Sequence, residues 1–148
     1  MVLKITPEDV YRIRDPKNFH AEIRREVELL RSNRAYLGLT MVIMCCIDAL
    51  AADSKGAKKW KFENFVKKHF PGLCTALKSV CPPSREGSRI LYEEFRNGFV
   101  HQRGPNSGYA IAEDHECSGA WADTDVKGKY VAINIDRLAK EFLKLLGT

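Results

Sequence analysis

The chain has 148 residues, and its 24 lysine and arginine residues outnumber its 19 aspartate and glutamate residues, giving a net charge of +5. Hydrophobic residues make up 45% and charged residues 29%, which is ordinary globular usage and argues against wholesale disorder. This length fits a single domain, residues 1–148, and is enough to bury a core. The whole charge excess lies in one basic segment, Lys55 to His69, which contains six lysines and one acid, Glu63. The rest of the chain is electrically balanced.

The sequence carries no recognisable export or membrane signal. The first residues, MVLKITPEDV, lack the apolar region and cleavage site of a secretory signal. The longest uncharged run, Ala35 to Ile47, is too short to span a bilayer and predicts a buried core helix. The five cysteines form no C-x-x-C pair, so we expect reduced thiols in a cytoplasmic protein. Cys45 and Cys46, inside the apolar run, are expected to be small core residues.

Helix signals occupy most of the chain. Thr6 and Pro7 predict the start of a short first helix, and Asp15 is expected to cap a long amphipathic helix. A third helix is apolar nearly all round and should lie at the centre of a bundle. Ser84 is expected to cap the helix that precedes a Gly/Pro loop. The predicted helices from the third onward cover about 34–52, 61–69, 73–80 and 84–101.

Two segments near the C-terminus have a residue pattern typical of strands. They are Tyr109 to Ala112 and Tyr130 to Ile135, and we expect them to form a small hairpin. Asp136 is expected to cap a final helix. The predicted fold is therefore mainly α, a bundle of four or five main helices with a small β-hairpin insertion before the C-terminal helix.

The end of the 84–101 helix carries a recognisable motif. Arg96-Asn97-x-x-x-His101 resembles the R-x(4–6)-H signature of the HEPN superfamily, including the polar residue that often follows the arginine. Arg14 to His20 has the same spacing, but Asp15-Pro16 interrupts it, so we treat it as a chance match. At the level of architecture the resemblance covers Pro16 to His101, whereas residues 109–135 depart from a minimal HEPN bundle.

The resemblance implies an all-α domain and a function in RNA metabolism. Many HEPN domains are metal-independent endoribonucleases, including toxins of toxin–antitoxin systems and RNases of antiviral defence. In the active ones, dimerisation brings two motifs into one cleft. The resemblance thus implies a homodimer, an RNA substrate, an antitoxin or other protein partner, and catalytic roles for Arg96, Asn97 and His101. Other HEPN domains are inactive and bind RNA or protein, and this alternative remains open.

The residue types of the motif fit this chemistry. Histidine is the side chain that titrates closest to neutral pH, and arginine presents a fork that matches phosphate oxygens. Arg96 and His101 are about 140° apart on an ideal helix, whereas Asn97 and His101 share a face. Asn97 could therefore orient His101, while Arg96 reaches in beside it or serves the other subunit. A glycine such as Gly98 destabilises a helix by about 1 kcal/mol relative to alanine. Close approach of a partner helix or a phosphate would explain why a glycine stands at this position.

A purely structural role fits the same residues, because cations near a helix C-terminus complement its dipole. For the basic segment, a solvated face is slightly favoured over phosphate binding, and the sequence shows no separate base-stacking platform. If phosphate binding applies, the substrate-binding residues are Lys58, Lys59, Lys61 and Arg103. We expect no metal and no cofactor, because His115, Cys117, Cys74 and Cys81 lack paired ligand spacing. The sequence gives equally little evidence for a catalytic thiol at Cys81 or Cys117, because nothing nearby indicates a lowered thiol pKa.

Overall fold

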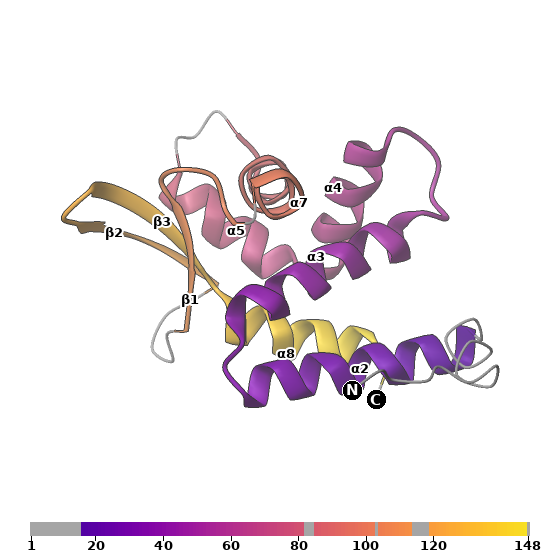
Figure 1. Cartoon of the computed structure of the whole chain (residues 1–148). Helices are drawn as coiled ribbons and strands as arrows, with labels where there is room; N and C mark the ends of the chain where they lie inside the picture. The colour runs from indigo at the N-terminus through magenta and orange to yellow at the C-terminus, as the bar shows by residue number, and fades with distance from the viewer. Residues whose placement is uncertain (1–15, 82–84, 103, 114–118, 148) are drawn as a thin grey trace.

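The computed structural model describes residues 16–81, 85–102, 104–113 and 119–147 (Figure 1). Helix α3 (Tyr36–Ala51) runs through the middle of the molecule and packs against α2, α4 and α8. The remaining elements, in chain order, are α2 (Pro16–Ser32), α4 (Lys58–His69), α5 (Pro71–Val80), α6 (Gly87–Ile90), the π-helical segment η1 (Leu91–Arg96), α7 (Asn97–Gln102), β1 (Tyr109–Ala112), β2 (Ala120–Asp125), β3 (Gly128–Asn134) and α8 (Ile135–Leu145). The prediction of a mainly helical chain is confirmed.

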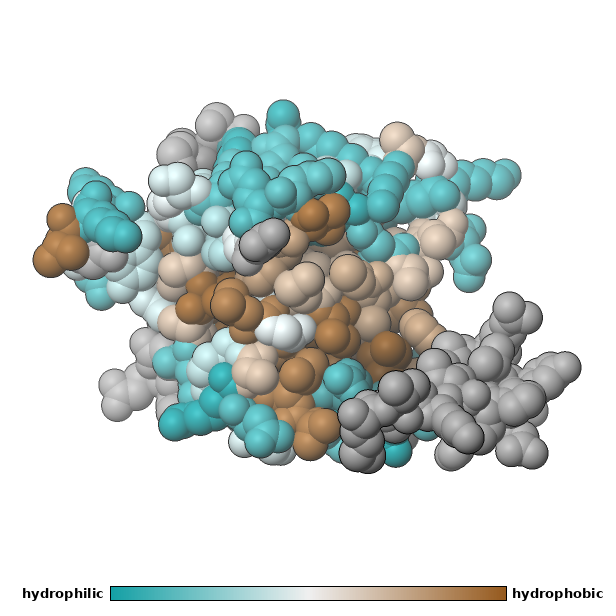
Figure 2. Space-filling model, in the orientation of Figure 1, coloured by the Kyte–Doolittle hydropathy of each residue, from teal (hydrophilic) through white to brown (hydrophobic). Residues whose placement is uncertain are grey.

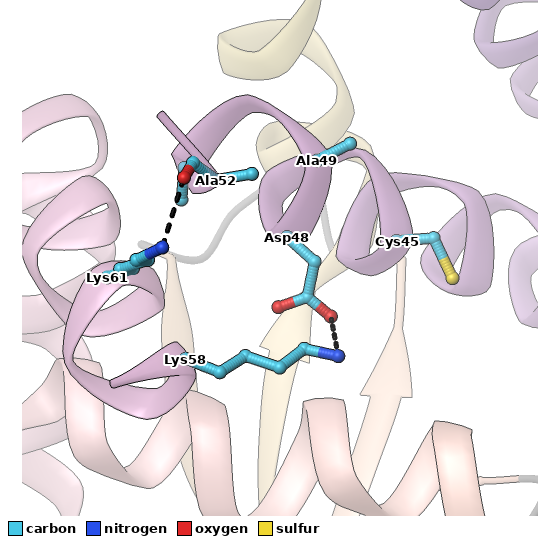
Figure 3. A pocket seen from close by; sticks show the side chains of 7 residues that line it. Cys45, Asp48, Ala49, Ala52, Lys58 and Lys61 are labelled. Carbon is cyan, nitrogen blue, oxygen red and sulfur yellow. Dashed lines mark hydrogen bonds and ion pairs between the residues drawn. The ribbon is translucent and has the colours of Figure 1, made fainter. Parts of the chain in front are cut away.

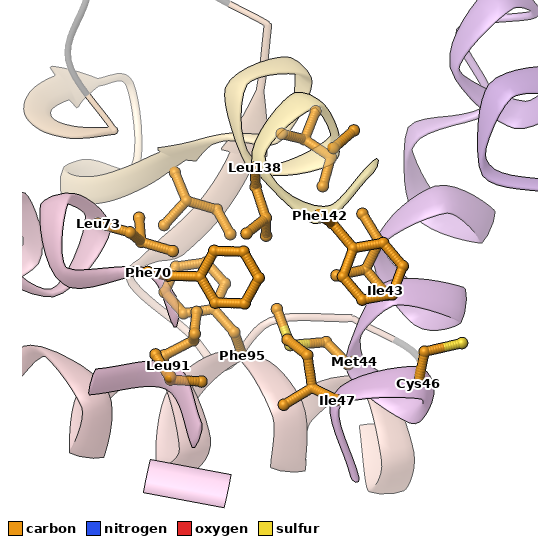
Figure 4. Close-up of a cluster of buried hydrophobic side chains, with 14 of the residues drawn as sticks. Ile43, Met44, Cys46, Ile47, Phe70, Leu73, Leu91, Phe95, Leu138 and Phe142 are labelled. Atoms are coloured by element: carbon orange, nitrogen blue, oxygen red, sulfur yellow. The ribbon is translucent and has the colours of Figure 1, made fainter. Parts of the chain in front are cut away.

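The core fills the space between α3 and α8 on one side and α4, α5 and the α6–η1–α7 helix on the other (Figures 1 and 4). Its largest fully buried side chains are aromatic, and they are Phe62, Phe70, Phe95 and Phe142. Burial of one such side chain stabilises the fold by about 1.5–3 kcal/mol. The predicted buried stripe Leu91, Phe95 and Phe99 is confirmed, so the motif helix is anchored in this core.

One face of α3 is not covered by the bundle. Leu37 is 58% exposed, Met41 is 44% exposed, and Cys45, one further turn along, is also exposed. The prediction that α3 is buried all round, with both Cys45 and Cys46 in the core, is therefore wrong for this face and for Cys45. Cys46 is buried as predicted. Apolar residues gather over α3 in the middle of the face shown in Figure 2.

The β-structure differs from the predicted hairpin. Strand β1 pairs in parallel with β3, with Ala110 opposite Ala132, so residues 109–112 and 130–135 do not form a hairpin. The hairpin is formed by β2 and β3, giving a three-stranded sheet in the order β1-β3-β2. The sequence of β2, AWADTD, escaped prediction because small and acidic residues disfavour strands locally. Gly128, at φ 123°, supplies the turn conformation that this hairpin requires.

Two helix starts also differ from the predictions. Helix α8 is capped by Asn134, whose side chain accepts a hydrogen bond from the Arg137 N–H at 3.1 Å, and not by Asp136. Asp136 lies in the first turn, where it pairs instead with Arg31 of α2 at 2.7 Å. The motif helix begins after Glu86, and Ser84 lies outside the described residues.

Several sequence predictions fall on parts of the chain that are not described. These are the helix beginning at Thr6, the Asp15 cap, the chance match starting at Arg14, and the side chains of Arg103, His115 and Cys117. Within residues 16–81, 85–102, 104–113 and 119–147, no helix has the length and apolar character needed to cross a membrane.

Candidate functional site

The motif lies where the long helix formed by residues 87–102 changes its winding. Asn97 donates its backbone N–H to the Tyr92 carbonyl, five residues back, which is the π-helical pattern. The π segment ends at Arg96, and α7 continues the helix through His101. Short π segments inside α-helices are rare and occur frequently at functional sites. The change in winding therefore coincides with the motif.

Arg96 points into the protein and is only 5% exposed. Its Nε and Nη2 donate to Asp48 Oδ2 on α3 at 2.9 and 2.8 Å. Its Nη1 donates to Asn97 Oδ1 at 2.9 Å, and the guanidinium lies 5.2 Å from the centre of the Tyr92 ring. Such charge-assisted hydrogen bonds are stronger than neutral ones. Because the pair is buried, removal of one partner would leave the other as an uncompensated buried charge. Arg96 thus ties the motif helix to α3.

His101 has the opposite environment. Its side chain is exposed on α7, close to the end of the helix. Among the described residues, no hydrogen bond or ion pair engages it, and Asn97 bonds to Arg96 rather than to His101. The expectation that Arg96 and His101 do not share a helix face agrees with this arrangement. The imidazole is therefore accessible to a dissolved substrate.

Gly98, between these residues, has a specific packing role. A Cβ atom there would lie 2.3 Å from the Gly104 carbonyl oxygen and 2.9 Å from the Asn106 nitrogen. Asn106 in turn donates its backbone N–H to the Glu94 carbonyl at 2.8 Å, which holds the loop against the helix. The close neighbour of Gly98 is therefore the chain's own loop, and not the partner helix or phosphate that the sequence suggested.

The basic segment meets the motif at Asp48. Lys58 Nζ lies 3.9 Å from Asp48 Oδ2, the same oxygen that binds Arg96. Lys58, Lys61 and Cys45 line a cavity of about 500 Å³ beside this carboxylate (Figure 3). Asp48 Oδ1 is buried there without a hydrogen-bond partner. Thus Asp48 on α3 contacts two segments that lie far apart in the sequence, the motif helix and the basic segment.

A second ionic cluster lies on the other side of α4. Glu93 Oε1 accepts hydrogen bonds from Lys59 at 2.7 Å and Arg89 at 2.8 Å, and Glu93 Oε2 accepts one from Arg85 at 2.9 Å. Burial alone would raise the pKa of Glu93, but the hydrogen bonds from Lys59 and Arg89 outweigh it, so its pKa lies below the ordinary value. Glu93 thus pairs with Arg89, whereas Arg96 pairs with Asp48.

Sequence reasoning missed Asp48 as part of the site. The signal was present, because Asp48 is the single charge in the apolar α3 sequence YLGLTMVIMCCIDALA. A charge in such a helix requires a partner. Burial raises the pKa of the Cys81 thiol and raises that of Cys74 to about 11, which works against a reactive thiolate at either position. Among the described residues, no three His, Cys, Asp or Glu side chains are grouped as metal ligands would be.

No protein-family model, no curated protein and no solved structure matches this chain. The functional argument therefore depends on the chain's own residues and on the motif resemblance.

Proposed function

We propose that this protein is an RNA-binding domain of HEPN type that cleaves RNA without a metal, with His101 as the proton-transfer residue. The observation that carries the proposal is the shared carboxylate of Asp48, which contacts both Arg96 of the motif and Lys58 of the basic segment. It links the motif helix, which carries the exposed His101, to the lysine-bearing start of α4. An imidazole and positive charge are the groups that metal-independent phosphodiester cleavage requires.

The chemistry would be attack by the ribose 2′-hydroxyl on the adjacent phosphorus. His101 takes the 2′-OH proton as the 2′-O–P bond forms, and the P–O5′ bond breaks. The products are a 2′,3′-cyclic phosphate and a 5′-hydroxyl, whose oxygen must receive a proton from an acid. In a symmetric dimer, the His101 of a second copy supplies that acid. Lys58 and Lys61 supply positive charge near the phosphate.

In this arrangement Arg96 is a positioning residue. Its Nε and both terminal nitrogens already donate to Asp48 and Asn97, so it holds α7 against α3 rather than presenting a free fork to phosphate. This differs from the role of phosphate stabiliser that the motif resemblance implies. The positive charge is therefore assigned to the lysines that surround Asp48.

The exposed apolar face of α3 supports the homodimer. Leu37 and Met41 on α3 and Val100 on α7 expose large apolar side chains, a feature typical of association surfaces. We expect Met41→Lys to shift the protein from dimer to monomer in sedimentation velocity. Val126→Lys, at the exposed tip of the β2–β3 turn, should leave the dimer intact. A wild-type protein that sediments as a monomer at high concentration would contradict this part of the proposal.

A second candidate is a binding module of the same fold without catalysis. The closed Arg96–Asp48 pair favours it, because a fully engaged arginine has a sufficient structural explanation. The two candidates differ in one observable. The enzyme cleaves RNA in the presence of EDTA, whereas the binding module binds RNA and leaves it uncleaved.

The test is incubation of purified protein with a mixed single-stranded RNA pool in EDTA. We expect cleavage products with 2′,3′-cyclic phosphate ends, and no cleavage of the same sequences made with 2′-O-methyl ribose. His101→Ala should abolish cleavage, and His20→Ala, which removes another exposed histidine, on α2, should retain it. Intact RNA at high protein concentration, or equal cleavage by His101→Ala, would overturn the proposed catalysis.

A further inference from the structure

The side of α4 that faces away from Asp48 carries a second concave surface, between α4 and α6. This depression has a volume of about 460 Å³, which lies in the range of small-ligand sites. Trp60, Lys59, Lys67 and Arg89 are among the residues that line it. We propose that it binds an unpaired RNA base, stacked on the Trp60 indole, with the flanking phosphates held by the surrounding cations. This inference rests on the proposed function and extends it to a second contact on the same RNA.

Trp60 is 55% exposed, although tryptophan is a residue that proteins usually bury to a large extent. Part of the ring lies beside the backbone of the loop before α4. Gly56 (φ 112°) lies against its edge, and a Cβ atom at Gly56 would be 3.2 Å from Trp60 Cδ1. An exposed indole offers a stacking surface. Stacking on an aromatic ring suits any base, because every base has a π face.

Three cations, Lys59, Lys67 and Arg89, line the depression with this ring, together with two acids, Glu63 and Glu86. Lys67 Nζ lies 5.8 Å from the centre of the Trp60 ring, at the outer limit of a cation–π contact. Lys59 and Arg89 both bind Glu93 Oε1, and both remain partly exposed at the rim of the depression. One shared carboxylate thus holds two cations close together. The arrangement places an aromatic platform beside partly exposed cations, a combination that single-strand binding sites use.

The two surfaces lie on different sides of the first turn of α4. Lys58 and Lys61 line the cavity next to Asp48, whereas Lys59 and Trp60 line the depression next to α6. Adjacent residues of one helical turn therefore belong to both. An RNA strand that crosses this turn contacts the lysines near the motif and then reaches Trp60. The Trp60 depression would thus bind nucleotides next to those held by Lys58 and Lys61.

The composition of α4 favours nucleic acid over a membrane surface. A helix that lies on a membrane presents several apolar side chains on its exposed face. On α4, Trp60 is the exposed apolar residue, and the other exposed residues are polar: Lys58, Asn64, Lys67 and Lys68. The charge of the basic segment also matches phosphates, whose contribution to binding weakens with salt.

The first experiment uses Trp121→Phe, which leaves Trp60 as the only tryptophan of the chain. A short single-stranded 2′-O-methyl RNA is added, because it binds without being cleaved, and Trp60 fluorescence is recorded. Stacking should quench this fluorescence, and an abasic strand of equal length should bind more weakly without quenching. Quenching that is equal for both strands, or absent at saturating RNA, would overturn the inference. A spectral shift with phosphatidylserine–phosphatidylcholine vesicles but not with RNA would also overturn it.

The second experiment compares affinities. Trp60→Ala should weaken binding of the 2′-O-methyl RNA by about 5-fold to 150-fold, whereas Trp60→Phe and Trp121→Phe should retain most of it. Equal affinity of Trp60→Ala and wild type would overturn the inference even if the protein cleaves RNA in EDTA. Conversely, quenching without any cleavage would uphold the Trp60 site and reject only the catalysis.

Discussion

The two ends of the Arg96–His101 motif have opposite environments. Arg96 lies inside the protein, and its guanidinium donates to Asp48 and Asn97. His101, five residues later on the same helix, is exposed, and among the described residues no polar contact engages it. A sequence motif presents these residues as a pair, whereas the structure gives them different physical roles.

Because of this difference, we expect substitution of Arg96 to affect the stability of the fold and substitution of His101 to affect RNA cleavage. A buried ion pair is maintained by the mutual dependence of its partners, so its loss is measured in the free energy of unfolding. An exposed imidazole contributes little to folding, so its loss should be measured in the reaction rate. Substitutions along the helix should therefore fall into two groups, and the predictions below run from the largest expected loss of stability to the smallest.

The largest effect is expected at the buried end. Arg96→Ala removes the partner of Asp48 and leaves a largely buried carboxylate, which should cost about 3 kcal/mol of unfolding free energy. Urea denaturation measures this loss. Arg25→Ala, which removes an exposed arginine paired with Glu22, should change stability by less than about 0.5 kcal/mol. If Arg96→Ala were as stable as the wild type, Arg96 could not be the residue that stabilises the fold, and the proposed difference between Arg96 and His101 would be contradicted.

Gly98 tests the region between the two ends. Gly98→Ala places a methyl group against the backbone of the loop at Gly104 and Asn106, so it should destabilise the protein by about 2 kcal/mol. The same change at Gly104, where a Cβ atom meets nothing within 4 Å, is the matched control and should cost less than about 0.5 kcal/mol. Similar urea midpoints for the two variants would show that the loop does not pack on the helix as described.

The ionic cluster around Glu93 predicts a pH dependence of stability. Because the pKa of Glu93 is lowered in the folded state, its contribution is complete above the unfolded value of about 4.3 and is lost as the pH falls through the lower folded value. Glu93→Gln should therefore cost about 1 kcal/mol at neutral pH and less at about pH 3. Urea denaturation at both pH values measures the difference. A cost that grows on acidification would contradict the assigned direction.

The sequence predicted much of the helical architecture because apolar periodicity and helix-start signals are local. The stripe Leu91, Phe95 and Phe99 is a local pattern of this kind, and it is buried as predicted. Strand β2 escaped because its pairing with β3 is decided by tertiary contacts rather than by its own residues. Exposure of Cys45 was missed because periodicity does not reveal how many neighbours surround an apolar helix.

The candidate site was predicted only in part for a similar reason. The motif and the basic segment are each visible in the sequence, but their meeting at Asp48 depends on how α3 packs between them. The Trp60 platform was missed because its exposure follows from the packing of α4 on its neighbours. A sequence motif identifies residues that could take part in a reaction, whereas tertiary packing decides which of those residues face solvent.

The exposed end of the motif should show the smallest effect on folding. His101→Ala is expected to change the unfolding free energy by less than about 0.5 kcal/mol, because the side chain is exposed. The same substitution should lower the rate of RNA cleavage in EDTA by about 100-fold or more, the usual contribution of a general acid or base. A loss of stability comparable to that of Arg96→Ala would place both residues in one structural role.

Rescue of His101→Ala by free imidazole tests the central claim most directly. If His101 transfers the proton, imidazole added to the folded variant should restore part of the RNA cleavage in EDTA, and methylimidazoles should restore it in proportion to their fit and basicity. His20→Ala should cleave at the wild-type rate without imidazole. A folded His101→Ala variant that cleaves RNA at the wild-type rate, or one whose lost cleavage imidazole fails to restore at any concentration, would contradict the assignment of proton transfer to His101.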